Sequence, residues 1–165
     1  MVYNEYLVND IKEKLVAKGE TLAIAESVTS GNLQAAISLA IDASKFYQGG
    51  ITVYNLGQKT RHLNVDPIHA EKCNCISVNV AVTMVLEVAK MFLSDYAIAI
   101  TGYASTVPEN EEEGLYAYVA IAYKNQLILD KRITSQKQDV SEVQLDYTNQ
   151  VLKLLHSLLY SEDRL

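Results

Sequence analysis

Apolar residues recur at helical spacing in several stretches of the chain. In residues 5–18, Leu7, Ile11 and Leu15 lie four positions apart, as on one face of an amphipathic helix. Residues 140–160 repeat this pattern with a stripe made of Val143, Tyr147, Val151, Leu154 and Leu158. Polar residues able to cap a helix precede other helical stretches, so we predict helices over 27–41, 55–63 and 77–92, with a loop or short helical turn at 66–67.

Between the helices, runs of apolar or alternating residues predict five strands. They cover residues 21–26, 51–54, 96–101, 115–123 and 126–133. The third run is continuously apolar, which is typical of a central strand covered on both faces. The last two alternate on either side of Lys124-Asn125 and form a β-hairpin. This order predicts an α/β fold, a three-layer α/β/α sandwich with a mixed, mostly parallel sheet and an antiparallel hairpin.

Size, composition and charge favour one globular domain that does not bind nucleic acids. The chain has 165 residues, 49% of them hydrophobic and 21% charged, so we expect a single domain over 1–165. A formal charge of −6 without a compensating basic cluster opposes nucleic-acid binding. The first residues lack the order of a signal peptide and no apolar run approaches a membrane span, so we expect a cytoplasmic protein without membrane contact.

The spacing of cysteines and histidines does not indicate a metal site or a cofactor. Cys73 and Cys75 are too close in sequence for ordinary disulfide geometry and do not form a CxxC motif, so we expect reduced thiols. The histidines are scattered, apart from a loose pairing of His69 with Cys73. We therefore expect neither a metal nor a cofactor.

Polar or small residues follow three of the predicted strands. Ser27, Asn55 and Gly102 each stand where a strand ends, two of them at the start of a predicted helix. In open α/β sheets, ligands bind at the carboxyl ends of strands, where helix N-termini offer unpaired N–H groups. The sequence therefore predicts a small-molecule site at this edge of the sheet.

Four short segments carry a more specific pattern: residues 25–31 are AESVTSG, residues 46–54 are FYQGGITVY followed by Lys59, residues 76–78 are ISV and residues 99–102 are AITG. They resemble, in turn, the AESCTGG, F-x-x-G-x-x-x-Y plus lysine, A-V-S-E and S/T-G segments of the CinA C-terminal domain family. The resemblance implies that family's fold. It also implies the activity of its bacterial members, which hydrolyse the carboxamide of nicotinamide mononucleotide to release ammonia, with a Ser/Lys pair as nucleophile and base.

The chemistry of the residues points to the same catalytic group. Ser27 is the expected nucleophile, and a serine hydroxyl needs a neighbouring base to take its proton. No Ser-His-Asp grouping is evident, whereas Lys59 can lose its proton when desolvated near a helix start, with Tyr54 orienting or relaying it. Thr29 and the N–H groups after Ser27 would stabilise an oxyanion. The expected substrate-binding residues are Glu26, Thr29, Ser30, Gly31, Asn55, Gly102 and Ser105.

Departures from the family pattern leave the substrate open. Ser30 replaces a glycine, Tyr103-Ala104-Ser105-Thr106 replaces the glycine-rich loop, and the usual arginines are missing from residues 136–142. The glutamates at 109 and 111–113 oppose a phosphorylated ligand electrostatically, or they belong to a solvated loop. The partner is therefore expected to be a small carboxamide, with nicotinamide mononucleotide as the one that the resemblance implies.

Three other interpretations stay beside the amidohydrolase. A catalytically silent CinA-like module for binding or assembly explains the altered glycine positions, and a nucleotide-binding regulator would use the strand ends without chemistry. Ser27 taken alone is equally suited to be a helix N-cap. We also expect a homo-oligomer, to which the hairpin residues Tyr116, Tyr118 and Tyr123 contribute either interface contacts or core packing.

Overall fold

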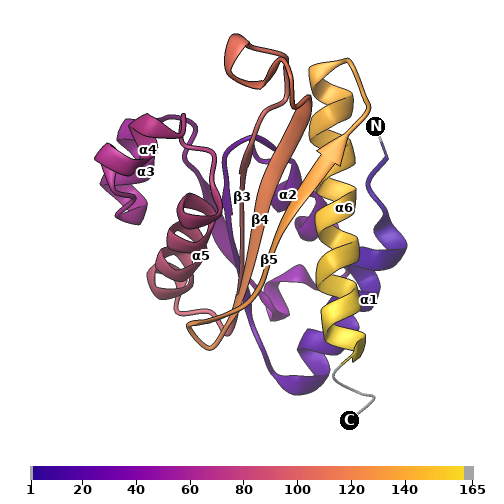
Figure 1. Cartoon of the computed structure of the whole chain (residues 1–165). Coiled ribbons are helices and arrows are strands. Elements are labelled where there is room, and N and C mark those ends of the chain that lie inside the picture. The colour runs from indigo at the N-terminus through magenta and orange to yellow at the C-terminus, as the bar shows by residue number, and fades with distance from the viewer. Residues whose placement is uncertain (1, 162–165) are drawn as a thin grey trace.

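The computed structural model describes residues 2–161, which form one mixed five-stranded sheet with helices on both faces (Figure 1). The strands are β1 (Leu22–Glu26), β2 (Tyr47–Thr52), β3 (Tyr96–Gly102), β4 (Leu115–Tyr123) and β5 (Gln126–Ser135), in the order β2-β1-β3-β4-β5. Strand β1 pairs in parallel with β2 and β3, whereas β3, β4 and β5 pair antiparallel. The predicted α/β class, mixed sheet and hairpin are confirmed, with two pairings of each kind.

The helices form the two outer layers of the sandwich. On one face lie α1 (Glu5–Lys18), α2 (Asn32–Ser38) and α6 (Val140–Ser161), and on the other α3 (Leu56–Leu63), α4 (Pro67–Lys72) and α5 (Val78–Phe92). The central strands sort their side chains by size between these layers. Ile24 and Ile98 pack toward α1 and α6, while Ala23 and Ala97 pack toward α5. Since alternate strand residues face opposite sides, one alternating sequence fills both cores.

The predicted bounds of α2 and β2 differ most from the structure, and the start of α2 lies beside the predicted site. Helix α2 begins at Asn32, not directly after Ser27, because residues 27–31 form a turn in which Ser30 and Gly31 have φ of 48° and 95°. Strand β2 begins at Tyr47, before the predicted start at residue 51. Gly50 lies inside this strand, where an added Cβ would come within 2.5 Å of the carbonyl oxygen of Ile24.

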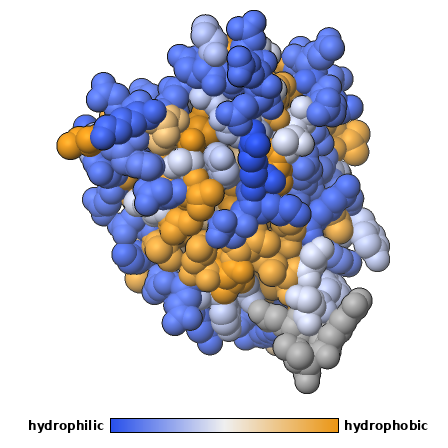
Figure 2. Space-filling model, in the orientation of Figure 1, coloured by the Kyte–Doolittle hydropathy of each residue, from blue (hydrophilic) through white to orange (hydrophobic). Residues whose placement is uncertain are grey.

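The hairpin tyrosines pack within the chain. Tyr123 lies against Tyr96 with ring centroids 4.5 Å apart, and Tyr116 meets Tyr103 edge to face at 5.3 Å. These contacts favour the core-packing interpretation for these two tyrosines, and the homo-oligomer stays a prediction. Figure 2 shows apolar surface over α5 and the β4–β5 hairpin, to which Leu127 and Ile128 contribute partly exposed side chains. In the described part of the chain, every helix is too short or too polar to cross a membrane.

Candidate active site

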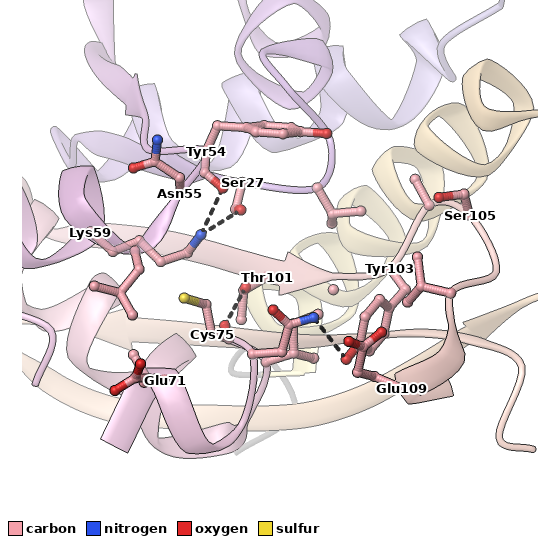
Figure 3. A pocket seen from close by; sticks show the side chains of 18 of the residues that line it. Ser27, Tyr54, Asn55, Lys59, Glu71, Cys75, Thr101, Tyr103, Ser105 and Glu109 are labelled. Atoms are coloured by element: carbon pink, nitrogen blue, oxygen red, sulfur yellow. Dashed lines mark hydrogen bonds between the residues drawn. The ribbon is translucent and has the colours of Figure 1, made fainter. Parts of the chain in front are cut away.

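A cavity of about 720 Å³ opens at the carboxyl ends of β1 and β3, beside α3, α4 and the loop after β3. Figure 3 shows its lining side chains. Six predicted residues line this cavity, namely Ser27, Tyr54, Asn55, Lys59, Gly102 and Ser105. Four other predicted residues, Glu26, Thr29, Ser30 and Gly31, do not line it. The structure therefore brings six of the ten predicted residues together at one edge of the sheet and places the other four outside the cavity.

Ser27 is held at the point where β1 leaves the sheet. Its backbone N–H donates to the carbonyl of Ile100 on the neighbouring strand β3 at 3.1 Å, and the residue is 6% exposed. The chain then turns sharply, with the N–H of Ser30 donating to the carbonyl of Ser27 at 3.0 Å. Ser27 is not the N-cap of α2, because Gly31 occupies that position. The N-cap interpretation is therefore wrong.

Lys59 lies in the first turns of α3 and extends its side chain to Ser27. Asn55 caps this helix by accepting from the N–H of Gln58 at 3.0 Å, which fixes where the helix begins. Lys59 is 1% exposed, and its Nζ lies 2.8 Å from the Oγ of Ser27. The same Nζ donates to the backbone carbonyl of Tyr54 at 3.2 Å. Two side chains 32 positions apart in sequence thus form a buried pair.

The surroundings of Lys59 make its charged form less favourable than in water. Within residues 2–161, Lys59 forms no ion pair with a carboxylate. Burial lowers the pKa of Lys59 below its ordinary range, and the nearby thiol of Cys75, when ionised, opposes part of that change. A neutral amine has a lone pair that accepts a proton, and the lowered pKa eases the change to that form where the Oγ of Ser27 lies 2.8 Å away.

Tyr54 contributes to the pair through its backbone. Its side chain is 68% exposed, and the ring extends over the cavity, away from the Nζ of Lys59 (Figure 3). Among the described residues, the hydroxyl of Tyr54 makes no hydrogen bond. The predicted proton relay through this hydroxyl therefore has no contact that supports it, and the ring is better placed to contact a ligand.

Glu26 builds the turn that holds Ser27. Its fully buried carboxylate accepts four hydrogen bonds: Oε1 from Thr29 Oγ1 and Leu33 N, both at 2.7 Å, and Oε2 from Gln34 N at 3.1 Å and Gln34 Nε2 at 2.8 Å. The carboxylate thereby caps α2 from the preceding strand, where helix N–H groups lack partners. The predicted substrate-binding roles of Glu26 and Thr29 are corrected to a role in shaping the turn.

The two remaining predicted residues of the turn also support it from outside the cavity. Ser30 is exposed, and Gly31 has the positive φ that favours glycine. The replacement of the family's glycine by Ser30 therefore does not narrow the cavity. Gly102 does line it, but its small size is required by packing, because an added Cβ would lie 2.4 Å from the Cβ of Ala117 on β4.

One backbone N–H group beside Ser27 is free and borders the cavity. The N–H groups of Val28 and Thr29 have no acceptor within residues 2–161, whereas the flanking N–H groups of Ser27 and Ser30 are both bonded. Val28 lines the cavity, whereas Thr29 is fully buried outside it. Unpaired N–H groups next to a nucleophile are the usual means of binding a developing oxyanion.

Sequence reasoning missed the opposite wall of the cavity. Glu71, Asn74 and Cys75 come from α4 and the turn after it, a segment predicted only as a loop or short helical turn. The hydroxyl of Thr101 donates to the carbonyl of Cys75 at 2.8 Å and fixes this turn against β3. Asp66 and Pro67, an N-cap and first-turn pair, were the available signal for this helix. Residues 2–161 contain no cluster of three or more side chains able to hold a metal ion.

The CinA C-terminal domain family model matches residues 4–159. The chain belongs to this family. A CinA-like protein of Prochlorococcus marinus is 29% identical over 163 residues, which cover 98% of this chain and 38% of that protein. Protein YdeJ of Escherichia coli is 34% identical over 110 residues, covering 67% of this chain and 63% of that protein. The chain thus spans well under half the length of the Prochlorococcus CinA-like protein.

Solved structures of CinA superfamily proteins have the same fold. One from Klebsiella pneumoniae matches with a TM-score of 0.85 at 26% identity, covering 95% of this chain and 98% of that one. A competence or damage-inducible protein from Enterobacter asburiae matches with a TM-score of 0.88 at 23% identity, covering 96% of this chain and 99% of that one. The second likeness establishes shared architecture only.

Proposed function

We propose that this CinA-family chain is a serine amidohydrolase that converts a small carboxamide to a carboxylate and ammonia. The observation that carries the proposal is the 2.8 Å contact between the Nζ of Lys59 and the Oγ of Ser27. A lysine desolvated without a carboxylate partner is costly to bury, and the lowering of its pKa supplies the base that serine requires. A binding module without catalytic activity would not need a buried lysine beside this serine.

In the first half of the reaction, Ser27 is acylated. Its Oγ attacks the carbonyl carbon while the hydroxyl proton moves to the Nζ of Lys59. The resulting oxyanion would accept a hydrogen bond from the free N–H of Val28, and such a donor contributes about 3 kcal/mol in serine hydrolases. The C–N bond then breaks, the ammonium group of Lys59 returns the proton to the leaving nitrogen, and ammonia departs.

In the second half, water repeats the same steps on the ester. Lys59, again neutral, takes a proton from water as the oxygen adds to the acyl carbon. Collapse of this intermediate breaks the ester bond, and the Oγ of Ser27 recovers its proton from Lys59. The products are the carboxylate and a regenerated pair, so one base serves both halves without a metal or a redox step being invoked.

Ammonia release tests the proposal directly. Purified protein is incubated with nicotinamide mononucleotide, the compound that the family resemblance implies, and with a panel of small carboxamides. Ser27→Ala and Lys59→Met should each lower the rate by at least about 100-fold, because nucleophile or base is lost. Matched controls are Ser30→Ala, from the same turn, and Lys72→Met, an exposed lysine of α4; neither lines the cavity. Equal rates in wild type and Ser27→Ala across the panel would favour the catalytically silent module.

A further inference from the structure

The turn that carries the nucleophile depends on α6 for one of its hydrogen bonds. In this turn, residues 27–30, the N–H of Ser30 donates to the carbonyl of Ser27, but no backbone N–H of residues 2–161 donates to the carbonyl of Val28. Gln144 of α6, 116 positions away, fills that place, because its Nε2 donates to this carbonyl at 3.0 Å. Val28 is 5% exposed, and a buried carbonyl without a partner is unfavourable. The last helix therefore anchors the residue whose N–H borders the cavity.

A second contact orients the side-chain amide of Gln144. Its Oε1 lies 3.5 Å from the Nδ2 of Asn32, which donates to the carbonyl of Thr29 at 2.7 Å. Because the oxygen of Gln144 faces a donor, its nitrogen faces the carbonyl of Val28. Asn32 is fixed in turn, since its Oδ1 accepts from the hydroxyl of Tyr3 at 2.8 Å. Side-chain amides from outside the turn thus hold two of its carbonyls.

The same helix also holds the loop that follows β3. Tyr147 comes three positions after Gln144, so the two side chains share one side of α6. Tyr147 is fully buried, and its hydroxyl donates to the carbonyl of Tyr103 at 2.9 Å. Burial raises the pKa of Tyr147, so this hydroxyl keeps the proton that it donates. Tyr103 lines the cavity directly after β3, and α6 therefore reaches two segments of the cavity wall from neighbouring positions.

We infer that Gln144 and Tyr147 are positioning residues, through which α6 fixes the nucleophile turn and the loop after β3 at the spacing that the reaction requires. Neither side chain lines the cavity, so each acts through the residue it holds, Val28 or Tyr103, and not by touching the substrate. The expected effect on rate rests on the proposed amidohydrolase function, whereas the effect on the order of the two segments does not. A misplacement of about 1 Å can slow a reaction about 100-fold, so losing one of these hydrogen bonds should lower kcat by about 5- to 20-fold.

Two substitutions remove these donors and keep the size of the side chains. They are Gln144→Met and Tyr147→Phe, each assayed for ammonia release on the carboxamide that the wild type hydrolyses fastest. Each should lower kcat by about 5- to 20-fold and leave KM within about twofold, because the residues that line the cavity are unchanged. A rise in KM at constant kcat would show that the two residues affect substrate binding instead, and would overturn the inference.

The chain offers a matched control for each substitution. Gln150, also on α6, donates from its Nε2 to the carbonyl of Thr134 at 2.9 Å, away from the cavity. Tyr123 donates from its hydroxyl to Glu20 at the opposite end of the sheet. Gln150→Met and Tyr123→Phe therefore remove a comparable hydrogen bond, and urea unfolding measures what each loss does to stability. Both controls should keep kcat within about twofold of wild type, and a loss of rate shared by the controls would overturn the inference.

Amide hydrogen exchange, followed by NMR without substrate, tests the positioning independently of turnover. The N–H of Ser30 reports on the nucleophile turn, and that of Tyr103, which donates to the carbonyl of Tyr116 at 2.9 Å, reports on the loop after β3. Gln144→Met should speed exchange at Ser30, and Tyr147→Phe at Tyr103, each by at least about fivefold and without the other amide changing. Unchanged exchange at both amides, or faster exchange with an unchanged kcat, would overturn the inference. Faster exchange in a protein that releases no ammonia from any carboxamide would overturn the amidohydrolase proposal alone.

Discussion

Glu26→Gln should destabilise the chain strongly although it changes only one atom of the side chain. The two carboxylate oxygens accept four hydrogen bonds, two each. Glutamine retains one oxygen that accepts hydrogen bonds. Its NH₂ group replaces the other oxygen and, as a donor, would face two groups that are themselves donors. Hydrogen bonds to charged groups contribute about 1.5–3 kcal/mol each, so losing two predicts roughly 3–6 kcal/mol. For a domain of this size the melting temperature should fall by at least about 6 °C.

Urea unfolding followed by circular dichroism measures this change. The matched control is Glu112→Gln, which removes an exposed carboxylate and should stay within about 0.5 kcal/mol of wild type. Because Glu26 precedes Ser27 and fixes the turn after it, Glu26→Gln should also lose ammonia release at temperatures where it remains folded. A loss of stability below about 1 kcal/mol would show that the buried carboxylate does not stabilise α2 as described.

Two further predictions concern Lys59 and Gly102. Because burial lowers the pKa of Lys59, the folded chain binds fewer protons than the unfolded chain between that lowered pKa and the ordinary one, so wild-type stability rises with pH there. Lys59→Met should therefore be more stable than wild type at neutral pH. The urea midpoints of the two proteins should converge as the pH rises above the ordinary lysine pKa, and a difference that stays constant with pH would contradict this. Gly102→Ala should lower the free energy of unfolding by about 1–3 kcal/mol, because the added Cβ would lie 2.4 Å from the Cβ of Ala117. Gly57→Ala in α3 is the control: its added Cβ would lie 3.6 Å from the nearest atom, so it should raise that free energy by up to about 1 kcal/mol in the same assay.

The parts of the site that the sequence could predict depend on local chemistry and strand order. Ser27 follows a buried strand, and Lys59 lies on the helix after the next strand along the chain. Since parallel strands end at the same edge, their juxtaposition could be expected before any coordinates. Whether a segment is a helix or a strand was also predictable. The spacing of apolar residues differs between the two, because only one side of each element faces the core.

The parts that the sequence could not predict depend on contacts between distant elements. Ser27 was suited to be a helix N-cap, but the carboxylate of Glu26 on β1 accepts from the first N–H groups of α2, which begins at Asn32. Glu71 and Glu109 come from opposite sides of the cavity, and no sequence spacing relates them. Their placement at one cavity becomes visible only once the fold has brought α4 and the loop after β3 together.

The central claim is that a desolvated amine acts as the base for a serine hydroxyl, and the titration of one side chain tests it. Protein labelled with ¹³C at lysine Cε would be titrated by NMR, with the Lys59 signal assigned by its absence in Lys59→Met. We predict a midpoint below the ordinary value of about 10.4, together with a rise in ammonia release through the same pH range. A Lys59 midpoint at or above that ordinary value would contradict the account.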